Sequence, residues 1–251
     1  MIPFFDRIYT WYLRRSIKHI PTHVAIIQDG NRRFASSIGK SISYGHYCGA
    51  KTTENIITWI LKLNIRHLTL FTFSTENFRR SEDEKKALRS LFLEKIFALK
   101  TDPRISKYEI NVSIIGDRSL IDAEVLDHIT QLENQTKHYS RYYVHIAVAY
   151  GGRNEIVRVT KKVSNLVDNG TIQVDDISPS LITSLIYPND APPMLPVDLL
   201  IRTANEYRTS NFLFWLSNGC SSTVYFSKPT WPEFRYIDLL RAIKEYNKDL
   251  F

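Results

Sequence analysis

Short apolar runs recur along the chain and predict six β-strands. The runs are rich in β-branched and aromatic residues and show little alternation with polar ones, which is typical of strands buried on both faces. They lie at residues 24–27, 68–73, 110–115, 143–149, 199–201 and 223–226. The pattern therefore indicates a sheet that lies inside the molecule.

Between most of these runs the apolar spacing changes to that of amphipathic helices. Such patterns occupy residues 54–63, 121–132 and 155–166, and another opens at residues 81–84, which have the form of a capping box. The alternation of buried strands with helices favours an α/β fold in which one domain holds a mainly parallel six-stranded sheet with helices on both faces. Ligands of such sheets bind at the carboxyl ends of the strands.

The end of the first predicted strand carries an unusual group of polar residues. The apolar run at 24–27 leads into residues 28–33, Gln-Asp-Gly-Asn-Arg-Arg, and then into a predicted helix start. Glycine lets the backbone approach a ligand, a helix N-terminus offers free N–H donors, and arginine binds phosphate oxygens in pairs. The segment predicts a site for a phosphorylated ligand, although turns contain Asp, Gly and Asn for conformational reasons alone.

Polar residues also follow two other predicted strands. Ser74 and Asn77 come after the second strand, and Arg202 comes after the fifth. Because parallel strands end at the same edge of a sheet, we expect these side chains to converge with Asp29.

Composition narrows the class of protein. The chain of 251 residues is 43% hydrophobic, which is enough for a substantial core. No apolar run reaches the roughly 18 residues of a membrane span, and no signal peptide is visible. Cys48 and Cys220 stand outside any Cys-x-x-Cys or Cys/His array, so we expect reduced thiols in a cytoplasmic protein.

The net charge of +7 suits anionic partners such as diphosphates or anionic lipid. The basic residues are spread out without a nucleic-acid-binding motif, so nucleic acid is not expected as a partner.

The first twenty residues form a separate case. Residues 1–20 predict an N-terminal helix that precedes a domain at residues 21–251. Aromatic and aliphatic residues fall close to helical spacing, and three cationic residues follow them: Phe4, Phe5, Ile8, Trp11, Tyr12 and Leu13, then Arg14, Arg15 and Lys18. Such a helix can rest on an anionic membrane, pack against the body of the protein, or pack against a dimer mate. We favour packing, because aromatic stripes belong to cores more often than to membrane anchors.

Five further motifs, taken in order with the first turn, give the chain a family resemblance. They are FTFSTENFRRSEDE at 71–84, IIGD at 114–117, AYGGRNEIV at 149–157, DLLIRTANEYRTSNFLFW at 198–215 and YFSKPTWPEF at 225–234. Together they resemble the cis-prenyltransferase family, the synthases of Z-configured polyprenyl diphosphates, and most closely its archaeal branch. The resemblance spans residues 21–246, nearly the whole chain.

The resemblance implies an activity and its machinery. Family members join an allylic prenyl diphosphate to isopentenyl diphosphate and release diphosphate. It therefore implies a Mg²⁺ cofactor, a hydrophobic tunnel for the growing chain and a homodimer. Asp29 matches the family's essential aspartate, which would hold Mg²⁺ on a diphosphate.

The resemblance assigns roles to the remaining site residues, position by position. The allylic diphosphate would bind at Gly30, Asn31, Arg32, Arg33 and His46, and the second diphosphate at Arg202, Arg208 and Ser210. Ser74 and Asn77 match residues near the reacting isopentenyl group, where they would bond to Asp29 or to the diphosphate and assist proton removal. Thr75 and Arg80 belong to the same motif and are assigned to substrate binding, whereas Arg79 is expected to be a solvated charge. Phe34 and Phe78 would line the prenyl chain or belong to the core.

Four departures from the family pattern leave alternatives open. Ile42 replaces an arginine, Thr223 replaces a glutamate metal ligand after an insertion at 218–222, and Ala204 and Asn205 replace a Gly-Gly pair. The chain also ends in KEYNKDLF, without the family's Arg-x-Gly tail. The chain can therefore be a standard elongating enzyme, an irregular head-to-middle (lavandulyl-type) synthase that uses dimethylallyl diphosphate, or a subunit that needs a catalytic partner. The retained Asp-Gly-Asn turn argues against the last.

Overall fold

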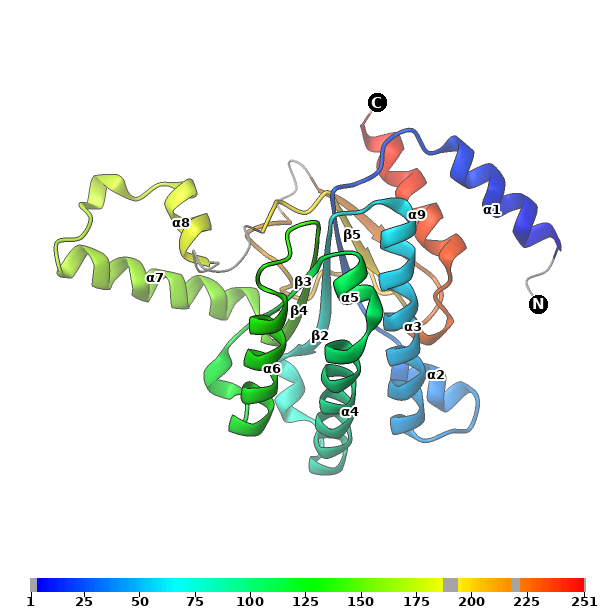
Figure 1. Ribbon diagram of the computed structural model, residues 1–251, viewed down its shortest axis with the longest axis horizontal. Helices are drawn as coiled ribbons and strands as arrows, with labels where there is room; N and C mark the ends of the chain where they lie inside the picture. The colour runs from blue at the N-terminus through cyan, green and yellow to red at the C-terminus, as the bar shows by residue number, and fades with distance from the viewer. Residues whose placement is uncertain (1–3, 187–193, 218–221, 251) are drawn as a thin grey trace.

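Six parallel strands form one sheet at the positions that the apolar runs predict (Figure 1). The structure is a computed structural model that describes residues 4–186, 194–217 and 222–250. The strands are β1 (His23–Ile27), β2 (His67–Ser74), β3 (Ile110–Ile115), β4 (Tyr142–Tyr150), β5 (Leu199–Arg202) and β6 (Thr223–Phe226). Their order is β3-β4-β2-β1-β5-β6, and every neighbouring pair is parallel. The predicted α/β fold with a six-stranded parallel sheet is confirmed.

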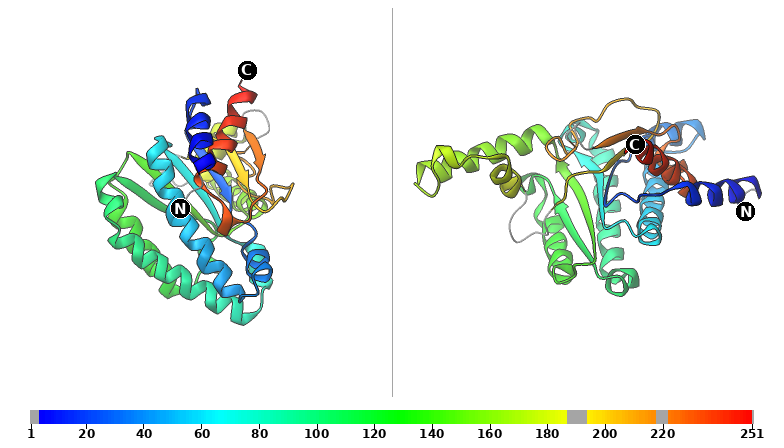
Figure 2. Two further views of the ribbon diagram at one scale, coloured as in Figure 1. Left: turned by 90° about the vertical axis from the view of Figure 1, so that its right-hand side faces the viewer. Right: turned by 90° about the horizontal axis from the view of Figure 1, so that it is seen from above.

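Helices cover both faces of the sheet (Figure 2). They are α1 (Phe4–Ser16), α2 (Asn31–Ser37), α3 (Ile42–Leu63), α4 (Glu82–Thr101), α5 (Pro103–Lys107), α6 (Ala123–Thr136), α7 (Gly152–Asp168), α8 (Pro179–Ile186) and α9 (Tyr236–Asp249). Apolar side chains of α3, α4, α6 and α9 pack on one face, and those of α7 and α8 on the other. The sheet is therefore buried on both sides, which explains why its strands lack alternation.

Two helices differ from the sequence-based expectation. Helix α3 begins at Ile42, well before the predicted start at residue 54. Its first turns contain Gly45 and Gly49, where an added Cβ would lie 2.2 Å from the Asn31 backbone oxygen and from Asn31 Oδ1, respectively. These turns pack through close backbone approach rather than through an apolar stripe, so the hydrophobic pattern does not reveal them. Helix α9 was not predicted, although Leu239 and Ile243 on it are fully buried.

Some sequence features lie wholly or partly outside the described residues. These are Cys220, most of the insertion at 218–222 and most of a loop predicted at 188–196. The Cys48 thiol is partly buried on α3 and is free. None of the helices in the described part of the chain is both long and apolar enough to cross a membrane.

Three buried histidines lie side by side on neighbouring strands. His23 on β1, His67 on β2 and His145 on β4 form a triangular cluster, with ring centroids 5.7 Å (His23–His67), 5.9 Å (His67–His145) and 6.3 Å (His23–His145) apart. Burial lowers the pKa of His23 and of His67 to about 4, and that of His145 well below its usual value. All three rings are therefore neutral in the folded protein near neutral pH.

Acid should destabilise the fold through this histidine cluster. In the unfolded chain the imidazoles protonate below pH 6.5, whereas in the fold His23 and His67 resist protonation until about pH 4. The stabilisation is complete above pH 6.5 and is lost as the pH falls towards 4. His23 alone is expected to account for about 3 kcal/mol over this range. Urea unfolding at several pH values measures the loss.

A matched pair of variants tests whether the buried histidine cluster causes the acid sensitivity. His67→Gln should flatten the pH dependence, while His138→Gln, at an exposed position, should leave it unchanged. An unfolding free energy that stays constant between pH 7 and 4.5 in the wild type would contradict this account.

Candidate active site

The first strand delivers Asp29 into a turn that is fixed from both sides. The Asp29 N–H donates to Thr203 Oγ1 at 2.9 Å, and the Trp231 N–H donates to the Asp29 carbonyl at 2.8 Å. Gly30 follows with φ of 101°, and an added Cβ would lie 2.8 Å from Ala204 Cβ. Only glycine fits this conformation and this spacing, and α2 starts at the next residue.

Arg202 joins this turn to the later arginine loop. It ends β5, opposite Ile27 at the end of β1. Its Nη2 donates to Asp29 Oδ2 at 2.7 Å, and its Nη1 donates to Ser210 Oγ at 2.6 Å and to the Arg208 carbonyl. Only 4% of Arg202 is exposed, so this guanidinium is a buried link between the two predicted diphosphate loops. The expected convergence of Asp29 with Arg202 is confirmed.

The arginine loop holds several non-glycine residues in the left-handed region. Ala204 and Asn205 have φ of 68° and 56°, and Ser210 and Asn211 have φ of 46° and 61°. The Ala204 N–H donates to the Pro229 carbonyl at 2.7 Å, and the Asn205 N–H donates to the Ser227 carbonyl at 2.9 Å. The loop thus keeps the conformation that a Gly-Gly pair would allow, at a cost in strain that these bonds offset.

Glu206 neutralises two of the predicted phosphate-binding cations. Its carboxylate lies 3.2 Å from Arg33 Nη2 and 2.6 Å from Arg208 Nη1. Arg33 also lies 3.9 Å from Asp29. A diphosphate entering between the two arginines would compete with this carboxylate. Glu206 was not predicted as a site residue, although an acid between two phosphate-binding arginines is visible in the sequence.

His46 contacts Glu84, a residue that the sequence predicted only as part of a helix cap. His46 Nε2 lies 3.2 Å from Glu84 Oε1, which also accepts from Arg80 Nη1 at 2.8 Å. Burial lowers the pKa of His46, and the positive charges of Arg80 and Arg32 lower it further. The hydrogen bond to Glu84 raises it, but by less. Burial would raise the pKa of Glu84, but the hydrogen bond to His46 and the charge of Arg80 outweigh it and lower the pKa. The ionised carboxylate therefore fixes the ring with Nε2–H as donor.

Ser74 ends β2, and Thr75 and Asn77 lie in the turn that follows it, at the same edge of the sheet. The Ser74 N–H donates to Asn77 Oδ1 at 3.0 Å, and Thr75 approaches Gly151 at the start of α7. Within the described residues, no hydrogen bond joins Ser74 or Asn77 to Asp29, which was one of their two expected partners. The reason is that the Asn77 amide oxygen caps its own turn. Their other predicted partner, the diphosphate, stays a prediction.

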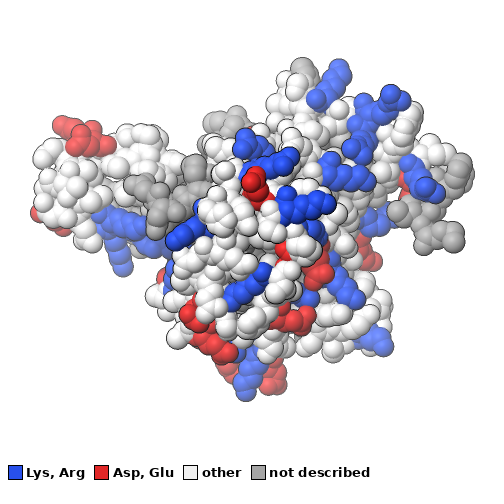
Figure 3. Space-filling model, in the orientation of Figure 1, with Lys and Arg blue, Asp and Glu red and all other residues white. Residues whose placement is uncertain are grey.

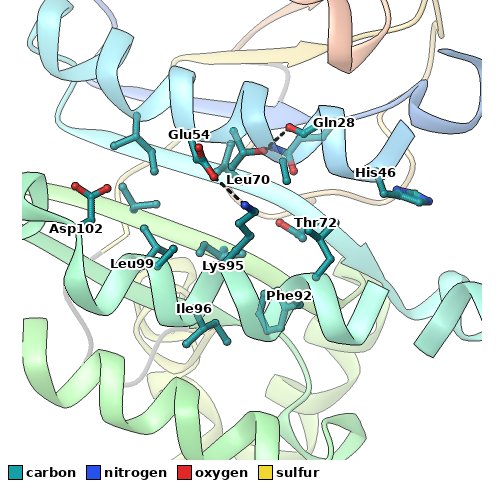
Figure 4. Close-up of a pocket in the computed structure, with 18 of the residues that line it drawn as sticks. Gln28, His46, Glu54, Leu70, Thr72, Phe92, Lys95, Ile96, Leu99 and Asp102 are labelled. Atoms are coloured by element: carbon teal, nitrogen blue, oxygen red, sulfur yellow. Dashed lines mark hydrogen bonds and ion pairs between the residues drawn. The ribbon is translucent and has the colours of Figure 1, made fainter. Parts of the chain in front are cut away.

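An apolar cavity opens beside the Asp29 turn (Figure 4). It has a volume of about 380 Å³ and lies between α3, α4 and the sheet, with Asn31 and His46 at one end. Its walls are mainly aliphatic and aromatic: Ile57, Leu70, Leu88, Leu91, Phe92, Ile96, Leu99, Val144 and Ile146. Phe78 lines a neighbouring cavity of about 340 Å³, whereas Phe34 is a partly buried residue on α2.

The residues present can hold a magnesium ion only together with substrate phosphates. Asp29 offers a carboxylate that is about one-third exposed, and the described residues hold no group of three or more acidic, histidine or cysteine side chains that could enclose a metal. Thr223, where the family has a glutamate, begins β6. Magnesium is commonly bound by one or two carboxylates together with substrate phosphates, and Asp29 fits such a shared site.

The chain is similar to known proteins over nearly its whole length. The chain matches a protein family described as "Putative undecaprenyl diphosphate synthase" over residues 27–250. It is 42% identical over 244 residues to a tritrans,polycis-undecaprenyl-diphosphate synthase (geranylgeranyl-diphosphate specific) of Methanosarcina mazei, over 96% of this chain and 82% of that protein. A protein of the same description from Methanocaldococcus jannaschii is also 42% identical, over 96% of this chain and 86% of that protein.

Two solved structures have the same fold. A lavandulyl diphosphate synthase from Lavandula x intermedia, in complex with dimethylallyl diphosphate, has a TM-score of 0.81 and 33% identity, over 90% of this chain and 94% of that one. A probable undecaprenyl diphosphate synthase from Campylobacter jejuni has a TM-score of 0.70 and 30% identity, over 91% of this chain and 96% of that one.

Proposed function

The chain belongs to the undecaprenyl diphosphate synthase family of cis-prenyltransferases, and from this premise we propose that it extends geranylgeranyl diphosphate by successive condensations with isopentenyl diphosphate. Prenyl chain elongation is the activity of its relatives, so the predicted family and enzyme class are confirmed. The primer is proposed from the relatives, which are geranylgeranyl-diphosphate specific.

One observation supports the proposal above the others. Arg202 hydrogen-bonds to Asp29 on one side and to Ser210 on the other, so two loops suited to diphosphates lie in direct contact. Condensation needs two diphosphate substrates side by side, and an apolar cavity adjoins the same turn. A binding module for a single phosphorylated ligand would not need this arrangement.

We assign roles to the residues as follows. Arg33, with the backbone of Gly30 and Asn31, would bind the allylic diphosphate, and Arg202, Arg208 and Ser210 the second one. The allylic C–O bond breaks, a C–C bond forms to the isopentenyl double bond, and a proton leaves that unit. Asn77 and Ser74 would position the isopentenyl group for proton loss. Mg²⁺, held by Asp29 and phosphate oxygens, would neutralise charge on the departing diphosphate.

The two alternative activities are less well supported. The lavandulyl synthase shares the fold, but the chain is more similar in sequence to the elongating archaeal enzymes, at 42% against 33% identity. A subunit without catalytic function would not need the Asp29–Arg202 bridge between the two loops. Standard elongation is therefore the proposed reaction.

A product analysis tests the proposal. Purified protein is incubated with Mg²⁺, geranylgeranyl diphosphate and radiolabelled isopentenyl diphosphate, or with dimethylallyl diphosphate in place of the latter. We expect a ladder of Z-prenyl products from the first mixture and none from the second. A branched single-addition product from the second mixture, or no product from either, would refute the proposal.

We also propose a homodimer that forms through α7 and α8. These two helices project away from the body of the protein (Figures 1 and 2). Val157 on α7 and the nearby Phe214 are exposed apolar side chains, which a partner would cover. Light scattering coupled to size-exclusion chromatography measures the mass, and a monomer at micromolar concentration would refute this proposal.

The contacts and exposure of helix α1 bear on two of the three readings of the N-terminal segment, packing against the body of the protein and contact with a membrane. Leu13 is fully buried, and α1 packs against α9, as we favoured. Ile8, Trp11 and Tyr12 are exposed, and Lys and Arg side chains gather on the surface over α1 and α9 (Figure 3). We propose that this surface also contacts anionic membrane, and sedimentation with phosphatidylglycerol vesicles tests it against neutral vesicles. Location in the cytoplasm stays a prediction.

A further inference from the structure

A second cavity lies along β3, which is the edge strand of the sheet. It has a volume of about 330 Å³, and β3, the turn after it and α7 supply most of its lining. Among the described residues, it shares none of its lining with the apolar cavity beside the Asp29 turn. Three strand spacings, or about 14 Å, separate β3 from the strand that precedes Asp29. This β3 cavity is therefore separate from the proposed active site.

The β3 cavity also lies on the other face of the sheet from the apolar cavity. Its apolar wall includes Ile115, Ile186 and Met194, which belong to the core between the sheet, α7 and α8. The apolar cavity lies instead beside α3 and α4, on the face that carries Leu70 and Ile146. A ligand in the β3 cavity would thus contact neither the prenyl chain nor the two diphosphate loops.

Two cations in the lining of the β3 cavity have carbonyl groups as their hydrogen-bond partners. Arg158 Nη1 donates to the Gly116 carbonyl at 2.8 Å, and Lys162 Nζ donates to the Leu185 carbonyl at 3.2 Å. Neither cation forms an ion pair with a carboxylate in the described part of the chain. A carbonyl dipole offsets less positive charge than a carboxylate does, so both side chains can bind an anion.

The acid that α7 places in the lining is Glu155. It is buried, and its Oε2 accepts a hydrogen bond from the Tyr150 hydroxyl at 2.8 Å. Burial raises the pKa of Glu155 to about 7, although the Tyr150 hydrogen bond and the charge of Arg158 act in the opposite direction. In about half of the molecules Glu155 is therefore uncharged at neutral pH and does not offset the charge of Arg158.

The other charged groups of the lining already have partners. Arg118 Nη2 lies 2.7 Å from Glu133 Oε1. Asp117 Oδ1 accepts from the Ser119 N–H at 3.1 Å and from the Ser119 hydroxyl at 2.6 Å. With Glu155 uncharged, the cations of the lining outnumber its carboxylates. The charge of the cavity therefore suits an anionic ligand.

A buried histidine in the lining has an unpaired nitrogen. His145 is 1% exposed, its Nδ1 lies 2.7 Å from Ser113 Oγ, and its Nε2 has no hydrogen-bond partner among the described residues. Burial lowers the pKa of His145, so the ring is neutral. When Ser113 donates to Nδ1, the ring proton is on Nε2, which can donate to an oxygen in the cavity. Buried polar atoms are nearly always paired, so this nitrogen points to a ligand.

We propose that the β3 cavity binds a small organic phosphate. The phosphate oxygens lie between Arg158 and Lys162, and His145 Nε2 donates to one of them. A short apolar body lies against Ile186 and Met194. The volume of about 330 Å³ is at the lower end of the range for small-molecule sites, which excludes a long prenyl chain. This binding site goes beyond the proposed elongation activity and does not depend on it.

Met194 makes the β3 cavity observable in the full-length protein. The chain has two methionines, Met1 and Met194, and Met194 lines the cavity. Protein labelled with ¹³C-methyl methionine is titrated with butyl phosphate, and Met194→Leu assigns the signal. We expect a saturable shift of the Met194 methyl signal with a Kd below about 1 mM. Inorganic phosphate should bind about tenfold more weakly, because it has no apolar body to bury.

Three variants show where the probe binds. Arg158→Gln should raise the Kd of butyl phosphate about tenfold or more. Lys161→Gln, at an exposed position on α7 outside the lining, and Arg208→Gln, in the arginine loop, should leave the titration unchanged. Melting temperatures verify that the variants are folded.

Three results would overturn the proposed phosphate site. They are the absence of a saturable Met194 shift, equally tight binding of inorganic phosphate, and a shift that Arg208→Gln abolishes while Arg158→Gln keeps it. The titration needs no turnover, so each of these results leaves the proposed elongation activity standing. Conversely, a protein without elongation activity can still show the Met194 shift.

Discussion

Asp29→Asn is expected to lower the turnover of prenyl transfer by about a hundredfold or more, while the protein stays folded. The variant keeps the size of the side chain and one oxygen, which can accept from either Arg202 or the Gly30 N–H, because in the wild type these two donors bind different carboxylate oxygens. It loses the negative charge that would hold Mg²⁺ beside the diphosphate. Initial rates with geranylgeranyl and isopentenyl diphosphates measure the effect.

Two further measurements make this result specific to Asp29. Asp83→Asn, at an exposed position in the first turn of α4, removes a carboxylate away from the site and should keep the wild-type rate. Thermal unfolding should show a change of only a few degrees for Asp29→Asn, because the side chain is about one-third exposed and water can solvate it. Wild-type turnover by the folded Asp29→Asn variant would show that the assigned mechanism is wrong.

Arg202→Lys should cause the second large loss, about a hundredfold in kcat/KM for isopentenyl diphosphate. Lysine keeps the positive charge but has no planar fork, so it cannot bond at once to Asp29, to Ser210 and to the Arg208 carbonyl. The loop that carries Arg208 would lose its anchor. Because Arg202 is buried, we also expect the unfolding free energy to fall by about 1–3 kcal/mol.

The KM values of the two substrates show which diphosphate the arginine loop binds. KM should rise more for isopentenyl diphosphate than for the allylic primer, because Arg202 and Arg208 are assigned to the second diphosphate. Arg79→Lys, at an exposed position, is the matched control and should leave both KM values unchanged. An Arg202→Lys variant with a wild-type KM for isopentenyl diphosphate would contradict the assignment of this loop.

Local patterns in the sequence were sufficient for the sheet and for most of its helices. All six predicted strands lie within two residues of the observed bounds, because burial on both faces leaves an apolar run that needs no knowledge of the partner strand. The start of α3 was missed because Gly45 and Gly49 pack through backbone contact and leave no apolar stripe. The Asp29 turn was recognisable because its residues are consecutive.

The sequence by itself determined which residues are candidates for the chemistry, since residue type and local spacing are properties of the chain. Only the tertiary structure decided how they are paired. Arg202 contacts Asp29 because β5 lies beside β1 in the sheet. Glu84, which the sequence predicted only as part of a helix cap, contacts His46 through its carboxylate. The contact of Lys95 with Glu54 likewise depends on the packing of α4 against α3. Such pairs depend on distances in space between residues far apart in the chain, and a local pattern does not contain those distances.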